Sequence, residues 1–188
     1  MTSFDGLLRF LDTRSFPSLW YWLALCAVWA ITTRSVLGVP VEVVIRARQT
    51  AGEAERPEGL LLLDWLSLTL PRWRIGRGEG AVLVGVTAFV LVALGVLGFG
   101  YGLETAQALV LLFTPLGLLL LMRLRLAHRL AAVMGAAESG GLPAAEAAAQ
   151  AARLMTRHRR IVAALSIMAV AIAAAWGTLW NLMHPYGV

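Results

Sequence analysis

Four long apolar runs dominate the sequence and limit the folds that it can adopt. An α-helix needs about 20 mostly apolar residues to cross the hydrocarbon core of a membrane. Hydrophobic residues make up 59% of the 188-residue chain and charged residues 14%, against roughly 45–50% and ~25% in soluble domains. A soluble fold could not bury so much apolar surface. We therefore expect an all-α integral membrane protein, a single membrane domain over 1–188 whose four spans cover 17–39, 80–101, 105–122 and 161–183.

The positions of the basic residues predict the orientation of these spans. All 16 are arginine: Arg34 lies at the end of the first span and six more between it and the second span, seven lie between the third and fourth, and only Arg9 and Arg14 precede the first. Positively charged loops stay on the cytoplasmic side, so both long loops should be cytoplasmic and both termini periplasmic, in a bacterial inner membrane. The arginines flank apolar runs and form no basic face on a soluble domain. We therefore expect contact with the lipid bilayer and no nucleic-acid partner.

The two long loops are predicted to carry structure. Residues 123–160 combine helical spacing, a glycine-containing turn at 138–141 and an Ala-rich restart after Pro143, which predicts a cytoplasmic helical hairpin extending spans three and four. The loop 40–79 contains an apolar run too short to span, so residues 59–74 are expected to lie in the membrane interface. The predicted interfacial anchors of that segment are Trp65, Arg72, Trp73 and Arg74.

Residues 1–16 mix apolar and charged side chains, and we expect them to form a second interfacial segment on the outer face. The first span follows them without a basic region and cleavage pattern typical of a secretory signal peptide. It is therefore expected to be retained as an anchor.

The sequence contains few groups that could carry chemistry. No Asp, Glu, Lys or His lies in a span interior, which disfavours a proton- or ion-coupled transporter. A single cysteine, Cys26, excludes an intramolecular disulfide and a cysteine-based metal site. His128 and His158 lie on the two arms of the predicted hairpin and His184 near the opposite surface, which does not predict haem or metal binding. We expect no enzymatic activity, no metal and no cofactor.

Glycine and proline positions indicate how the spans pack. Gly95, Gly98 and Gly102 have near-helical spacing, which predicts a groove that admits another helix. A helix of the same chain is the first expectation for the occupant, and a separate subunit is the alternative. Pro115 should kink or locally break the third span, because it lacks a backbone N–H.

Three segments of the chain carry a family resemblance. They are SFPSLWYWLALCAVWAITTRSVLGVPVEVVIRAR (15–48), ETAQALVLLFTPLGLLLL (104–121) and LMTRHRRIVAALSIMAVAIAAAWGTLWNL (154–182). They resemble a family of uncharacterised bacterial inner-membrane proteins of similar length, often labelled automatically "component of SufBCD complex" after the iron–sulfur cluster scaffold. The resemblance implies an association with that scaffold. Because the chain has one cysteine, it would act as a membrane dock for a soluble machine and not as a cluster carrier.

Three hypotheses about function follow from these features. The first is a non-enzymatic accessory or assembly factor of the inner membrane that docks a cytoplasmic partner through Arg153, Arg157, Arg159 and Arg160. The second is a structural subunit embedded through its span surfaces in a larger respiratory or photosynthetic membrane complex. A transport component is the third, disfavoured by the uncharged spans. High salt should release a docked soluble partner, whereas an embedded subunit should depend on the detergent.

Overall fold

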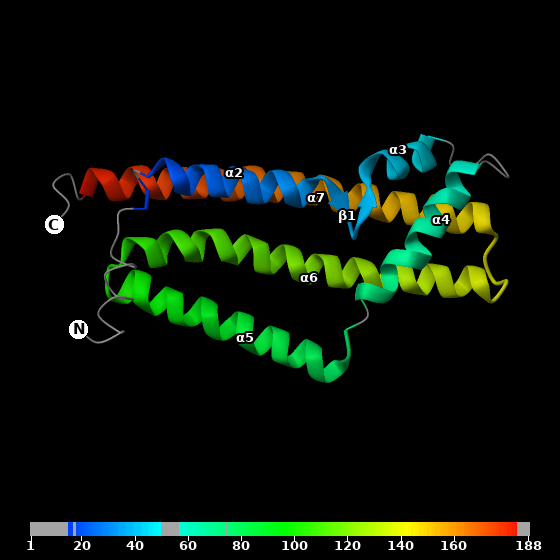
Figure 1. Cartoon of the computed structure of the whole chain (residues 1–188), viewed down its shortest axis with the longest axis horizontal. Coiled ribbons are helices and arrows are strands. Elements are labelled where there is room, and N and C mark those ends of the chain that lie inside the picture. The colour runs from blue at the N-terminus through cyan, green and yellow to red at the C-terminus, as the bar shows by residue number, and fades with distance from the viewer. Residues whose placement is uncertain (1–14, 17, 50–56, 74, 184–188) are drawn as a thin grey trace. The chain divides into compact units, whose positions relative to one another are not determined.

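The computed structural model describes residues 15–16, 18–49, 57–73 and 75–183. These residues are mostly α-helical, as predicted (Figure 1). The predicted interfacial segment 1–16 lies almost entirely outside the described residues. The α-helices are α2 (Leu19–Thr33), α3 (Val41–Gln49), α4 (Pro57–Thr69), α5 (Arg77–Gly95), α6 (Glu104–Glu138) and α7 (Ala144–Met183).

Three helical segments of the described chain are long and apolar enough to cross a membrane. They are Gly78–Gly100, Glu104–Glu138 and Ala144–Met183. They contain the predicted spans three and four and all but the last residue of span two. The helix α2 is apolar but has only 15 residues. Pro115 lies inside α6, which is one continuous helix, so the predicted local break does not occur.

The first predicted span, 17–39, differs from the structure after the end of α2. The chain there forms an antiparallel pair of short strands, β1 (Ser35–Val36) and β2 (Val39–Pro40). The connecting residues Leu37 and Gly38 have φ angles of 55° and 91°, the left-handed backbone that a two-residue hairpin turn requires. The apolar side chains of this hairpin are buried against other parts of the protein. Composition alone could not distinguish them from lipid-facing residues.

The chain divides into two compact units. Unit 1 comprises residues 1–30, 77–118 and 165–188, and unit 2 comprises residues 31–76 and 119–164. The helices α6 and α7 contribute residues to both. Unit 2 carries 13 of the 16 arginines and 7 of the 11 acidic residues. The excess positive charge of the chain is therefore confined to unit 2.

The core of unit 2 combines the hairpin with four helices. The second half of α6 and the first half of α7 lie side by side, and α4 crosses them (Figure 1). Small side chains let these helices approach closely: a Cβ placed on Gly59 of α4 would lie 3.2 Å from the Cβ of Ala148 of α7. The buried cluster consists of Val36, Leu37, Val39, Val44, Ala47, Leu62, Leu66, Leu70, Leu126, Ala127, Leu130, Ala151, Ala152 and Met155.

The predicted interfacial segment 59–74 contains most of α4 and the 3₁₀-helix η1 (Leu70–Trp73). One face of α4 is buried in unit 2, with Leu62 and Leu66 fully inaccessible. The other sides expose Leu60, Leu61 and Leu68, the last at 72%. The segment is thus apolar on two sides, and one of them covers a protein core. This explains why its sequence lacks the clean polar face of a helix that only lies on a membrane.

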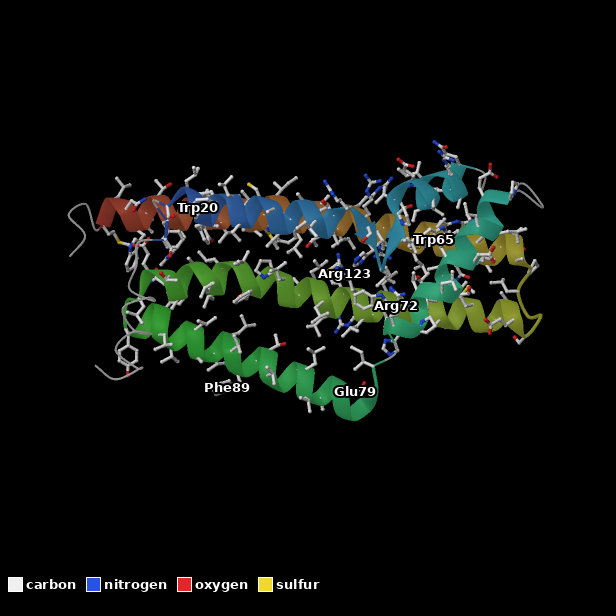
Figure 2. All side chains as sticks on the ribbon, viewed as in Figure 1. Trp20, Trp65, Arg72, Glu79, Phe89 and Arg123 are labelled. Carbon is white, nitrogen blue, oxygen red and sulfur yellow. The ribbon has the colours of Figure 1, made fainter. Side chains whose placement is uncertain are left out.

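In unit 1, α5 exposes apolar side chains over most of its surface, and one side that includes Thr87 and Leu91 is half-buried against α6. Only 6% of the residues in its most apolar window are buried, and Phe89 is 74% exposed on the outer side of the helix (Figure 2). Val82, Val86 and Val92 are exposed as well. A helix that is apolar all round and not covered by protein is stable in hydrocarbon and unfavourable in water. The surface of α5 is therefore compatible with a lipid environment.

The predicted glycine groove is replaced by one close contact. Gly98 lies in the π-helix η2 (Val96–Gly100), which follows α5, and a Cβ at this position would lie 2.8 Å from the backbone nitrogen of Gln107. A Cβ on Gly95 would meet no described atom within 4 Å, and Gly102, with φ of 73°, belongs to the turn before α6. The three glycines therefore do not share one helix face. Gly98 alone of them permits a close approach within the described part of the chain.

Replacing Gly98 by alanine should destabilise unit 1. The added Cβ would overlap the backbone at the start of α6, and overpacking of this kind costs about 1–3 kcal/mol. The measurement is an SDS titration of the protein in mixed micelles, followed by near-UV circular dichroism. Gly95→Ala is the matched control, since the same methyl group meets open space. Equal unfolding midpoints for the two variants would contradict the importance of the contact.

Candidate functional site

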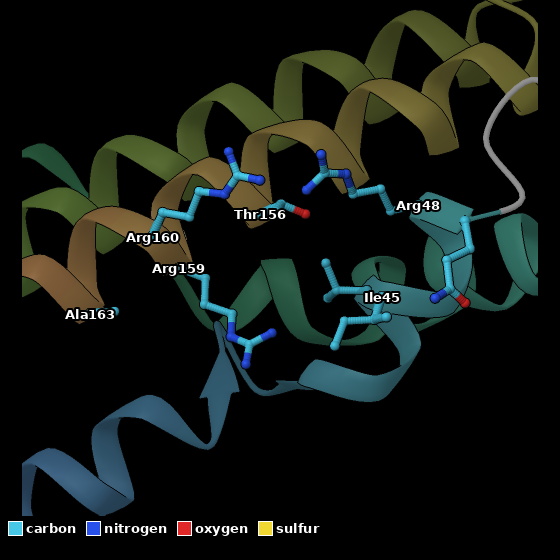
Figure 3. A pocket seen from close by; sticks show the side chains of 8 residues that line it. Ile45, Arg48, Thr156, Arg159, Arg160 and Ala163 are labelled. Carbon is cyan, nitrogen blue, oxygen red and sulfur yellow. The ribbon is translucent and has the colours of Figure 1, made fainter.

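An open cleft in unit 2 is lined by three arginines. We call it the arginine cleft, and its volume is about 610 Å³ (Figure 3). Two helices supply its walls, and no acidic side chain is among the described residues that line it. The lining residues are Val44, Ile45, Arg48 and Gln49 of α3 and Thr156, Arg159, Arg160 and Ala163 of α7.

The positions of the cleft residues follow from how α3 and α7 pack. The buried residues Val44 and Ala47 attach α3 to the core of unit 2, which leaves the next residue, Arg48, exposed at the rim. On α7, Met155 is fully buried, and Thr156 and Arg159 lie on the adjoining part of the helix surface. The cleft therefore lies beside the packed core, on two helices that the core holds in place.

The electrostatics of the cleft are unusual because like charges converge. Arg48 and Arg160 extend toward each other with Thr156 between them, and Arg159 lies on another side of the cleft (Figure 3). The Thr156 hydroxyl donates a hydrogen bond to the carbonyl oxygen of Ala152 at 2.7 Å, so its proton is already used. The cleft therefore offers guanidinium donors, which suit anionic oxygen ligands.

A second, smaller cleft of about 160 Å³ is also basic. It lies in unit 2 between α6 and α7, and His158 in it is buried. A neighbouring arginine, Arg123, is used structurally: its Nη2 donates to the carbonyl oxygen of Thr32 at 2.8 Å. The residues that line the second cleft are Met122, Arg125, Leu126 and Arg129 of α6 and Leu154, Arg157, His158 and Ile161 of α7.

The four arginines predicted to bind a partner are all exposed on α7. The structure separates them: Arg159 and Arg160 line the arginine cleft, and Arg157 lines the second cleft. Arg153, one helical turn before Arg157, lines neither. The sequence missed Arg48, because it lies more than 100 residues before Arg159 and Arg160 in the chain.

The predicted interfacial anchors have different roles. Trp65 and Arg72 are exposed on unit 2, as an anchor would be. Trp73 is half-buried, and its Nε1 donates to the carbonyl oxygen of Leu37 at 3.3 Å. That indole helps to fix the hairpin turn. Arg74 lies outside the described residues.

The histidines and the cysteine form no metal site in the described part of the chain, where no group of three or more potential ligands occurs. The Nδ1 atom of His128 lies 2.8 Å from the carbonyl oxygen of Leu124 on the same helix. Cys26 is exposed on α2. His184 lies outside the described residues.

A polar cluster in unit 1 was not predicted. The Glu104 carboxylate is buried and accepts hydrogen bonds from the backbone N–H groups of Ser15 and Phe16, at 2.7 and 2.6 Å, and from Trp180 Nε1 at 3.1 Å. Gln107, one turn later, donates to the carbonyl oxygen of Gly98 at 2.8 Å and accepts from Trp176 Nε1 at 2.9 Å. These bonds connect segments that are far apart in the sequence.

The only local signal for this cluster was an acidic residue in the turn between two apolar runs. Such a residue normally stabilises a helix N-terminus from solvent, so the sequence gives no reason to expect burial. The role of Glu104 depends on donors roughly 75 to 90 positions away, among them Ser15 and Trp180. We interpret the cluster as structural, because each polar atom named here has a partner.

Comparison of the chain with protein-family models, with curated proteins and with solved structures finds no match. The function must therefore be inferred from the residues themselves. In the described chain, the arginine cleft and the second cleft are the arrangements whose charges call for an external ligand.

Replacing Glu104 by glutamine should destabilise unit 1 by about 1–3 kcal/mol. The amide of glutamine would keep one oxygen that accepts from the backbone N–H groups. Its N–H₂ group, however, would face the N–H of Trp180, so that two hydrogen-bond donors would point at each other without an acceptor. An SDS titration in mixed micelles measures the difference. Glu138→Gln is the matched control, because Glu138 lies on the same helix and is exposed. A structural role for Glu104 is excluded if both variants unfold like the wild type.

Proposed function

We propose that this chain is a non-enzymatic protein of the bacterial inner membrane that crosses the bilayer four times and docks a soluble cytoplasmic protein. The observation that carries the proposal is the concentration of 13 of the 16 arginines in unit 2, a unit with its own packed core. A rigid core holds exposed arginines in fixed positions. Fixed positions distinguish a recognition surface from a flexible basic loop.

The four-span topology rests on α2 as well as on the three longer helices. At about 1.5 Å per residue, α2 covers about 22 Å, less than the roughly 30 Å of the hydrocarbon core. Bilayer thinning and a snorkelling Arg34 would close this gap. The arginine-rich segments 31–76 and 119–164 are separated by two of the longer spans, so they lie on one side whether or not α2 crosses. The positive-inside tendency makes that side cytoplasmic.

The docking face that we propose consists of Arg125 and Arg129 on α6 and Arg153 and Arg157 on α7. Each pair has an i, i+4 spacing, which places its two side chains on one helix face. All four side chains are exposed. Guanidinium groups bind carboxylates with two parallel hydrogen bonds, so the face fits an acidic protein surface. The family resemblance makes the iron–sulfur assembly machinery the first candidate partner.

A second candidate function is that of an embedded subunit in a larger membrane complex. The observation that favours it is the apolar surface of α5, most of which is exposed in the described protein. Lipid would cover that surface equally well, so it does not single out an embedded subunit. The docking function is therefore the one that we put forward.

Single-cysteine labelling should establish the topology. With Cys26 replaced by alanine, Tyr101→Cys in the turn before α6 should react with a membrane-impermeant maleimide added to spheroplasts. Ser139→Cys, in the turn between α6 and α7, should react only after lysis. An added N-terminal tag should be digested by external protease if α2 crosses the membrane. If the tag is protected from the protease while both cysteines react as expected, the chain crosses the membrane three times.

Loss of the docking arginines should remove the partner. The double variant Arg153→Gln/Arg157→Gln, purified from native membranes in mild detergent, should retain at least about tenfold less of a stoichiometric soluble protein, as measured by quantitative mass spectrometry. About 1 M NaCl should release the same protein from the wild type, because the Debye length falls to about 3 Å.

The matched control for this experiment is Arg34→Gln/Arg72→Gln, which removes the same charge from other elements of unit 2. The control should retain the partner. Equal retention by both double variants would contradict docking through α7. A set of membrane proteins that resists salt and leaves only in harsher detergent would instead support the embedded subunit.

A further inference from the structure

We infer that the arginine cleft is a specific binding site for the phosphate group of an anionic phospholipid. This inference rests on the membrane location proposed above but not on the protein partner. It concerns Arg48, Arg159 and Arg160, which are separate from the proposed docking face. The argument depends on the convergence of charge, on the apolar wall of the cleft and on its place along α7.

The convergence of several guanidinium groups is favourable only when an anion binds between them. Arg48 and Arg160 come from different helices and extend toward each other across Thr156 (Figure 3). Like charges held together repel, and no acidic residue among the described lining residues offsets them. A phosphate placed between them would accept hydrogen bonds from both, with the forked geometry that guanidinium and phosphate share. Arg159 adds a third donor group at another side of the same cleft.

The size and lining of the cleft favour a lipid over a free anion. Its volume of about 610 Å³ falls in the range of sites for small organic molecules, roughly 300–1,000 Å³. Val44, Ile45 and Ala163 supply an apolar wall beside the arginines. A headgroup with its glycerol would use both parts, whereas inorganic phosphate would use only the charged one.

The position of the cleft along α7 supports the same ligand. Thr156 lies just before the predicted span 161–183 and Ala163 just inside it, so the cleft covers the level at which headgroups meet acyl chains. Ile45, in the cleft, is 40% exposed. An exposed isoleucine beside arginines is typical of a surface that contacts both acyl chains and phosphates.

The test uses the full-length protein in a neutral detergent, stripped of lipid by washing. Native mass spectrometry measures the bound fraction while phosphatidylglycerol, phosphatidylcholine or glycerol 3-phosphate is titrated. We expect phosphatidylglycerol to bind at least tenfold more tightly than phosphatidylcholine and glycerol 3-phosphate. Inorganic phosphate at millimolar concentration should not displace the bound lipid.

The decisive variant is Arg48→Gln/Arg160→Gln, which should lose phosphatidylglycerol binding by at least tenfold. Arg48→Lys/Arg160→Lys keeps the charge but not the forked donors, and it should bind with intermediate affinity. The matched control is Arg153→Gln/Arg157→Gln, which removes the same charge from unit 2 outside the arginine cleft and should bind within about twofold of the wild type. All four substituted arginines are exposed, and circular dichroism checks that the fold is unchanged.

Three results would overturn the inference. Equal losses in the cleft variant and the control would show diffuse attraction to charge and no site. Equal affinities for phosphatidylglycerol and glycerol 3-phosphate, or displacement by inorganic phosphate, would assign the cleft to a free anion. Binding that survives Arg48→Gln/Arg160→Gln would place the lipid elsewhere. Because no protein partner is present, the outcome is independent of the co-purification experiment with Arg153 and Arg157.

Discussion

The cost of placing a guanidinium group in hydrocarbon governs the organisation of this chain. An arginine at the centre of a spanning helix costs about 2.5–3.5 kcal/mol on insertion scales, so 16 arginines cannot be scattered through a chain that is 59% hydrophobic. They are concentrated instead in unit 2, and the three in unit 1, Arg9, Arg14 and Arg77, lie outside the apolar runs. The division into two compact units is therefore also a division of charge.

This segregation changes what the long helices do along their length. In their apolar parts, α6 and α7 carry large aliphatic side chains suited to lipid, whereas in unit 2 the buried side of α7 consists largely of alanine. Alanine lets α4 and α6 pack closely against α7 at little cost in side-chain entropy. Because the inward positions are filled by small apolar residues, the arginines between them must point outward. Outward arginines on a packed core are a surface with fixed geometry.

The sequence predicted the long helices, but it did not predict the features that depend on tertiary contacts. The apolar lengths and the turn at 138–141 placed α6 and α7 correctly, because both signals are local. The first span was extended too far, since Val36 and Val39 look the same in a lipid-facing helix and in a buried hairpin. The contact of Trp73 with the hairpin was not predicted, because nothing nearby indicates that its indole donates to Leu37.

The candidate sites show the same limit. The exposure of the α7 arginines followed from their clustering beside an apolar run, but their separation into two clefts depends on which helix packs on which side. Arg48 joins one cleft only because Val44 and Ala47 attach α3 to the core. Glu104 was overlooked because a carboxylate in a short turn is normally exposed, and its burial depends on distant donors. A single sequence contains the residues of a site but not the pairing of its elements.

The two polar arrangements of the molecule differ in a way that bears on function. Around Glu104 and Gln107 the carboxylate and amide oxygens, two backbone amides and two indoles are all paired within the chain, as expected of a network that stabilises a fold. Around Arg48 and Arg160, like charges converge on an open space lined by no described acid. Local arrangements that lower the stability of a fold are typical of functional sites, which bind a ligand or a substrate. The paired cluster therefore belongs to folding, and the convergent arginines are where a ligand would add the missing negative charge.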